Sequence, residues 1–153
     1  MTTAPSPRLV GARAIARLML LEAATLAAFA ALHLSGALHP TGAASGADGA
    51  GVAEAIICVV LVAGATTLRR RPETGRPPAL ASIAFAILGF IVGLTFTVGG
   101  GQAIDLGYHL VMLPILILTA VLLWPDHRTR AAIRPRRPER GRAPARARGR
   151  RGR

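Results

Sequence analysis

Four long apolar runs divide the first 124 residues of this 153-residue chain, and they restrict its fold more than any other feature. The runs cover residues 18–38, 51–68, 79–98 and 104–124. About 20 helical residues cross the hydrocarbon core of a bilayer, where every backbone polar group needs a partner within the protein. The runs are rich in Ala and Leu, and they lack the strict alternation of barrel strands. We therefore predict an all-α fold: an integral membrane up-and-down bundle of four helices.

Arginine is distributed unevenly around these runs. Arginines precede the first run and follow the second and the fourth, whereas the loops at 39–50 and 99–103 contain none. Because Lys and Arg accumulate in short cytoplasmic loops, we expect both termini in the cytoplasm and the protein in the cytoplasmic (inner) membrane. Residues 1–17 would then form a cytoplasmic N-terminus. A cleaved signal peptide is the alternative for the first run, but the length of the run and its Glu22 are unusual for one.

Residues 125–153 differ in composition from the rest of the chain. They hold 12 of the 19 basic residues, against Asp126 and Glu139, and Ile133 is their one large apolar residue. Such a segment cannot bury a core, so we expect a disordered, Arg-rich cytoplasmic tail. Anionic lipid head groups are the expected partner of residues 128–153, at about 1 kcal/mol per basic residue near the membrane surface. Nucleic acid is the less favoured partner, because the tail has no aromatic residue to stack on bases.

Ionisable side chains inside the apolar runs are the candidate site residues, because charges in lipid are costly. Those near the outer ends of the runs are His33, Glu54, Asp105 and His109, with Tyr108 and His39 as further candidates. The first and last helices of an up-and-down bundle are neighbours, so His33 and His109 could face each other. Three interpretations stay open: a hydrogen-bonded network between helices, a site for a divalent metal such as zinc or copper, and axial ligation of haem b.

Glu22 is a separate candidate, four residues inside the cytoplasmic end of the first run. It lies roughly 16 Å deeper than His33 by helical rise and on the same helix face. This alignment suits a proton or substrate path, although we expect no polar residue to bridge the gap. The alternative is that Glu22 reaches the interface, or pairs with an arginine or with Thr66 and Thr67.

Small residues predict where helices pack closely, because close packing drives helix association in lipid. They form two sets: Ala23, Ala27, Ala31 and Ser35 in the first run, and the GxxxG pair Gly89 and Gly93 in the third. We expect both sets to make contacts within the bundle, with a homodimer seam as the alternative. Cys58 is the only cysteine, which excludes an internal disulfide and a CxxC redox pair, and we expect it to be a packing residue.

The stretches LLEAATLAAFAALHL, GVAEAIICVVLVAGA and DLGYHLVMLPILILTAVLL resemble small, uncharacterised four-span membrane proteins of GC-rich bacteria. This resemblance implies a membrane bundle but no particular activity. In general layout the chain is also similar to DoxX-like proteins and to the small multidrug transporters, which carry a glutamate in the first helix, as Glu22 does here. The one-sided arginine distribution and the long tail depart from that transporter family.

No catalytic motif is present: the sequence has no Gly-rich phosphate loop, no nucleophile elbow and no HExxH. We therefore expect a non-enzymatic multi-pass membrane protein, with an accessory or assembly subunit as the first hypothesis. A metal- or haem-binding protein that uses His33 and His109 is the alternative. A proton-coupled small transporter that uses Glu22 is the third.

Overall fold

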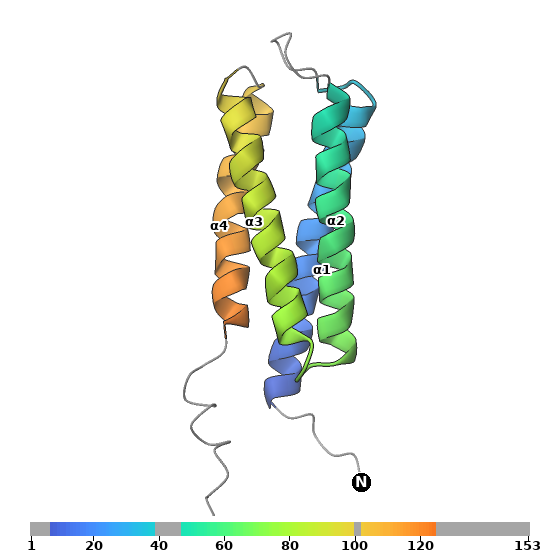
Figure 1. Cartoon of the computed structure of the whole chain (residues 1–153), viewed down its shortest axis with the longest axis vertical. Coiled ribbons are helices and arrows are strands. Elements are labelled where there is room, and N and C mark those ends of the chain that lie inside the picture. Colours follow the sequence, from blue (N-terminus) through green and yellow to red (C-terminus); the bar gives the residue numbers. More distant parts are fainter. Residues whose placement is uncertain (1–6, 39–46, 100–101, 125–153) are drawn as a thin grey trace, which may run out of the picture.

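The computed structural model describes residues 7–38, 47–99 and 102–124, and it forms four helices. These are α1 (Pro7–Leu34), α2 (Ala47–Arg70), α3 (Arg76–Val98) and α4 (Ala103–Leu123). The helices run alternately up and down, and each packs on the next, with α4 returning to α1 (Figure 1). The predicted all-α four-helix bundle is therefore confirmed for the described residues, as is the predicted contact between the first and last helices.

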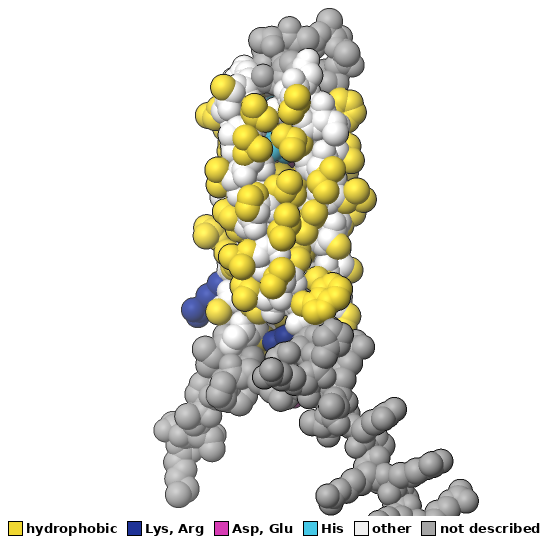
Figure 2. All heavy atoms as spheres, turned by 90° about the vertical axis from the view of Figure 1, so that its left-hand side faces the viewer, with side chains coloured by type: hydrophobic (Ala, Val, Ile, Leu, Met, Phe, Trp, Pro, Cys, Tyr) yellow, Lys and Arg dark blue, Asp and Glu magenta, His cyan; other side chains and the backbone are white. Residues whose placement is uncertain are grey.

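The surface of the bundle is apolar along the length of its helices. Each helix contains a span of 21 to 24 residues, with mean hydropathy between 1.8 and 2.4, that is long and apolar enough to cross a membrane. Leu21, Val59, Phe96 and Val121 are all more than 60% exposed. Figure 2 shows hydrophobic side chains covering most of one face, far more than a water-soluble monomer exposes. In length, composition and surface, the chain is a multi-pass membrane protein.

The helices extend beyond the apolar runs. α1 begins at Pro7 rather than at residue 18, and α2 begins at Ala47 rather than at residue 51. The predicted bounds followed the apolar runs, which leave out the less apolar residues at the start of each helix. In the other direction, α1 ends at Leu34, four residues before its apolar run does. Gly36 explains this end, since its φ of 76° is left-handed and its N–H donates to the carbonyl of His33 at 3.0 Å.

The two ends of the bundle carry different side chains. At one end α1 begins, α2 ends and α3 begins, and we call it the arginine end after Arg13, Arg17, Arg69, Arg70, Arg71 and Arg76. Arginine side chains lie at this lower end in Figure 2. At the other end, the histidine end, α1 and α3 finish and α2 and α4 begin, so His33, Glu54, Asp105 and His109 all lie there.

α1 packs on its neighbours through a stripe of mostly small residues. The hydrophobic residues of α1 that are less than 5% exposed recur every three or four positions: Ala12, Ala16, Met19, Ala23, Leu26 and Ala30. The small-residue ladder expected from the sequence shares only Ala23 with this stripe, and the expectation is wrong for Ala27, Ala31 and Ser35, which are exposed. A strict spacing of four residues drifts around a helix by about 40° per step, so it leaves the buried face within two turns.

The GxxxG pair of α3 makes the close contacts that its spacing predicts. A Cβ at Gly89 would lie 2.5 Å from Cδ1 of Ile57 on α2, and a Cβ at Gly93 would lie 2.6 Å from Nε2 of His109 on α4. The two glycines therefore let α3 approach two different neighbours.

Candidate functional site

His33 and Glu54 form a buried pair between α1 and α2. Nδ1 of His33 lies 2.8 Å from Oε2 of Glu54, and the two residues are 4% and 8% exposed. Gly51, one helical turn before Glu54, permits this approach, because a Cβ there would lie 2.7 Å from Cγ of Leu34 and 3.1 Å from Cβ of His33. The pair therefore depends on a site where α1 and α2 come unusually close.

Asp105 lies in the first turn of α4, where the unpaired N–H groups of a helix favour a negative charge. Oγ1 of Thr97 on α3 donates a hydrogen bond to Oδ2 of Asp105 at 3.0 Å. Nδ1 of His109 lies 3.0 Å from the main-chain oxygen of Asp105 and 3.3 Å from its Oδ1. Oδ1 is buried and accepts no well-formed hydrogen bond from the described residues, so the ion-pair contact with His109 at 3.3 Å is its closest polar interaction.

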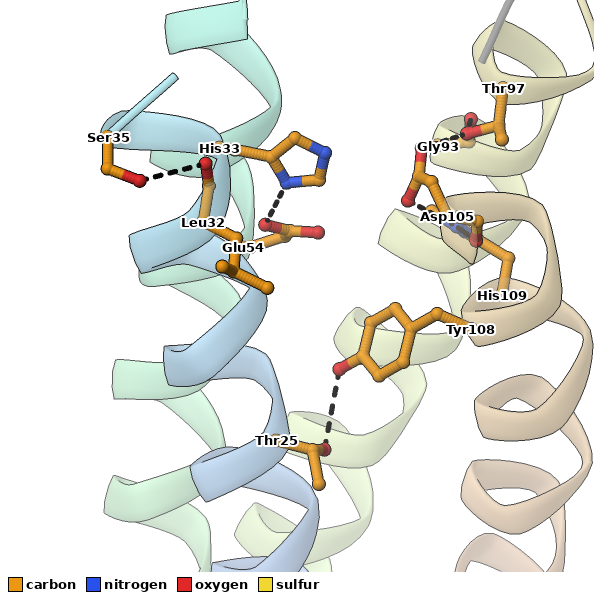
Figure 3. A network of polar contacts seen from close by, with 10 residues as sticks. All are labelled: Thr25, Leu32, His33, Ser35, Glu54, Gly93, Thr97, Asp105, Tyr108 and His109. Carbon is orange, nitrogen blue, oxygen red and sulfur yellow. Dashed lines mark hydrogen bonds and ion pairs between the residues drawn. The ribbon is translucent and has the colours of Figure 1, made fainter. Parts of the chain in front are cut away.

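Three of the predicted site residues meet at the histidine end. His33, Glu54 and Asp105 each offer one ligand atom, and these atoms lie within 4.8 Å of one another. In Figure 3, the Asp105 side chain extends from α4 toward His33 of α1 and Glu54 of α2. Hydrogen bonds between helices are present in two separate parts, His33 with Glu54 and Thr97 with Asp105. The group of three offers one imidazole and two carboxylates, a ligand set that zinc and related divalent ions accept.

His109 is placed differently from its three companions. Its ring packs on Phe90, with 5.1 Å between ring centroids, and its Nε2 faces Gly93 of α3. Nδ1 is therefore directed at Asp105 and Nε2 at Gly93, so both nitrogens of the ring face groups within the bundle. The alternative in which His33 and His109 are axial ligands of haem b is therefore less favoured than contact of His109 with Asp105 on its own helix.

Aromatic rings form a layer beside the cluster. Phe29 of α1 stacks on Tyr108 of α4 with 3.6 Å between centroids and 8° between planes, and Phe90 of α3 leans on the same ring. The Tyr108 hydroxyl donates to Oγ1 of Thr25 at 3.4 Å, and Thr25 donates to the main-chain oxygen of Glu22 at 2.8 Å. Tyr108 therefore directs its hydroxyl away from the cluster (Figure 3), and His39 lies outside the described residues.

Glu22 is 2% exposed, far from the cluster along α1. Its Oε1 lies 2.6 Å from Oγ1 of Thr119 on α4, and its Oε2 has no hydrogen-bond partner among the described residues. The partners expected from the sequence were an arginine, Thr66 or Thr67, and this expectation is wrong: Thr67 donates to its own helix, at Ala63. Glu22 faces α4 and the interior of the bundle, where no arginine in the described part of the chain pairs with it.

The sequence reasoning missed the threonines that support both sites. Thr97 precedes Asp105 by eight residues across a short loop, and a tight turn between antiparallel helices brings such positions together. Thr119 lies about as far from the end of α4 as Glu22 does from the start of the first apolar run, so matching depths would have paired them. Both signals follow from the up-and-down order of the helices together with the depth of each threonine along its helix.

Together, the fold and the cluster define a four-helix membrane protein with a buried polar site at one end of its bundle. Comparison of the chain with protein-family models, with curated proteins and with solved structures found no match.

Proposed function

We propose that this chain is a non-enzymatic membrane protein that binds a divalent metal ion at the histidine end. The observation that carries the proposal is the grouping of His33, Glu54 and Asp105, whose ligand atoms come from three helices and lie within 4.8 Å of one another. Three protein ligands leave one position of a tetrahedral ion for water or for a group from a partner. An ion held in this way would tie α1, α2 and α4 together, which suits an accessory or assembly subunit.

The distances suit a metal after small adjustments. Tetrahedral ligands at bond lengths of about 2.1 Å lie roughly 3.4 Å apart. The 2.8 Å contact between His33 and Glu54 would widen, and the longer separations within the group would close. The ion would take the place of the hydrogen that now joins Nδ1 of His33 to Glu54, and in a neutral imidazole that hydrogen would move to Nε2, so that Nδ1 could bind the ion.

His109 and Thr97 support the site as neighbours of a ligand. Thr97 donates to Oδ2 of Asp105, and Nδ1 of His109 contacts its main-chain oxygen and, at 3.3 Å, its Oδ1, where an ion would take the place of the weaker contact. Partners of this kind fix the orientation of a metal ligand, and their loss typically lowers the affinity for the metal about 10- to 100-fold.

The distribution of arginine supports an orientation in the membrane. The arginine end would face the cytoplasm and the histidine end the outside of the inner membrane, because Lys and Arg favour the cytoplasmic side. The metal site would then take its ion from the outer side.

The test is zinc binding by the full-length protein in mild detergent. After treatment with a chelator, the protein is dialysed against Zn²⁺, and bound metal is measured by elemental analysis. We expect about one equivalent in the wild type, loss of binding in His33→Ala, Glu54→Gln and Asp105→Asn, and weaker binding in His109→Ala. Glu73→Gln, at an exposed carboxylate, is the matched control and should bind as the wild type does. Absence of stoichiometric zinc, or equal binding in all variants, would overturn the proposal.

A further inference from the structure

The buried carboxyl group of Glu22 has one hydrogen-bond partner, Thr119, among the described residues, and its Oε2 has none. Thr119 carries a single hydroxyl hydrogen. Its Oγ1 lies 2.6 Å from Oε1 of Glu22 and 3.1 Å from the main-chain oxygen of Ile115, its own helix partner four residues back. Threonines in helices commonly donate to this carbonyl. If Glu22 is ionised, this hydrogen is the single donor to its buried carboxylate among the described residues, and it also faces the carbonyl of Ile115. A second hydrogen would give each of the two contacts its own.

A protonated Glu22 supplies that hydrogen. The acid then donates to Oγ1 of Thr119, and Thr119 donates to Ile115, so that both contacts hold a hydrogen. The 2.6 Å separation is within the range of short O–H···O hydrogen bonds. Oε2 of Glu22 becomes the carbonyl oxygen of a neutral acid, which costs less to leave unpaired than an oxygen of a buried carboxylate.

The surroundings of Glu22 offer no compensating positive charge. The side chain is 2% exposed in a helix whose neighbouring buried residues include Met19 and Leu26. Apart from Glu22, the titratable and charged side chains that the structure describes on the four helices are Arg13, Arg17 and His33 on α1, Glu54, Cys58, Arg69 and Arg70 on α2, Arg76 on α3, and Asp105, Tyr108 and His109 on α4. Within this described set, none forms an ion pair with Glu22.

We propose that Glu22 is a proton-binding site in the membrane-spanning part of the bundle, in which the acid donates its hydrogen to Thr119. The contact between α1 and α4 then depends on that proton. If the proton leaves, the carboxylate needs further donors, which only entering water or a movement of α1 against α4 can provide. This site does not depend on the proposed metal site, because Thr25 joins Tyr108 to the main chain of Glu22 and not to its carboxyl group.

The experiment is labelling of the full-length protein in detergent with dicyclohexylcarbodiimide, an apolar reagent that reacts with protonated carboxyl groups. The acid adds across a C=N bond of the reagent: the proton goes to nitrogen, the carboxyl oxygen bonds to carbon, and the adduct rearranges to a stable N-acylurea without loss of any atom. We expect mass spectrometry to find one reagent molecule on the peptide that contains Glu22 at neutral pH. Labelling should decline as the pH is raised into the alkaline range.

Matched variants separate a proton site from a merely buried residue. Glu22→Gln keeps the shape and a donor for Thr119, so it should fold and lose the label, whereas the exposed carboxylate of Glu73 should stay unlabelled in the same digest. Infrared difference spectra between the wild type and Glu22→Gln should contain the carbonyl band of a protonated acid, and Thr119→Val should shift that band. If Glu22→Gln does not fold, peptide mapping of the wild-type label still decides the question. An unlabelled Glu22 at neutral pH, or a spectrum without the acid band, would overturn the proposal.

Discussion

The two glycines of the GxxxG pair on α3 allow a controlled test of the packing. Gly93→Ala adds a methyl group 2.6 Å from Nε2 of His109, whereas ordinary contacts begin at 3.4 Å, so the two must separate by about 0.8 Å. The His109 ring has little freedom to move, because Phe90 lies against it and Asp105 holds its Nδ1. Gly89→Ala makes an equally short contact of 2.5 Å, but with Cδ1 of Ile57, the end of a flexible side chain.

The difference between the two variants is the quantity that the structure predicts. Replacing Gly by Ala in a helix gains up to about 1 kcal/mol in either variant, so this gain cancels in the comparison. Overpacking costs typically about 1 to 3 kcal/mol where the surroundings cannot move, and less where a side-chain end can rotate away. We therefore expect the free energy of unfolding of Gly93→Ala to be lower than that of Gly89→Ala by about 1 to 3 kcal/mol.

The measurement is reversible unfolding in mixed detergent micelles, followed by circular dichroism for both variants and the wild type. Gly93→Ala should also bind zinc more weakly if the metal proposal holds, because His109 would no longer hold Asp105 in place. Equal stabilities for the two variants, or a Gly93→Ala protein more stable than Gly89→Ala, would refute the argument that the His109 ring is fixed.

Three further predictions address the aromatic layer, the orientation and the tail. Tyr108→Leu should lose the stacking on Phe29, which should lower the free energy of unfolding by about 0.5 to 1.5 kcal/mol beyond the loss of buried apolar area. Tyr108→Phe keeps the ring, so its free energy of unfolding should stay within about 0.5 kcal/mol of the wild type in the same assay. Equal losses in the two variants would count against a role for the ring. In a Cys58→Ser background, a membrane-impermeant thiol reagent added to spheroplasts should label Ala37→Cys and not Glu73→Cys, and the reverse pattern would invert the proposed orientation. Proteoliposomes of the full chain should capture vesicles with anionic head groups in a salt-dependent manner, and truncation after Trp124 should abolish this capture; equal capture by both forms would exclude the tail as the binding segment.

The sequence by itself determined the number of helices and their alternation. Apolar runs of about 20 residues admit few structures in lipid, because backbone polar groups in hydrocarbon must bond within the helix. The breaks at Arg71 and Gly99 therefore located the loops, and α2 and α3 end within two residues of the ends of their runs. The same alternation gathered His33, Glu54, Asp105 and His109 at one end, because the depth of a residue follows from its position along a spanning helix.

The tertiary structure alone decided which of these side chains touch. Rotation of each helix about its axis sets the partners, and this rotation results from packing over the whole bundle rather than from any local pattern. The glycines show this most clearly: Gly51 lets His33 reach Glu54, while Gly93 receives the ring of His109 and so withdraws it from the cluster. Glu22 likewise has its hydrogen-bond partner, Thr119, on α4, 97 positions away in the sequence. Hydropathy fixes how deep a residue lies, but the direction of its side chain depends on contacts that exist only once all four helices have packed.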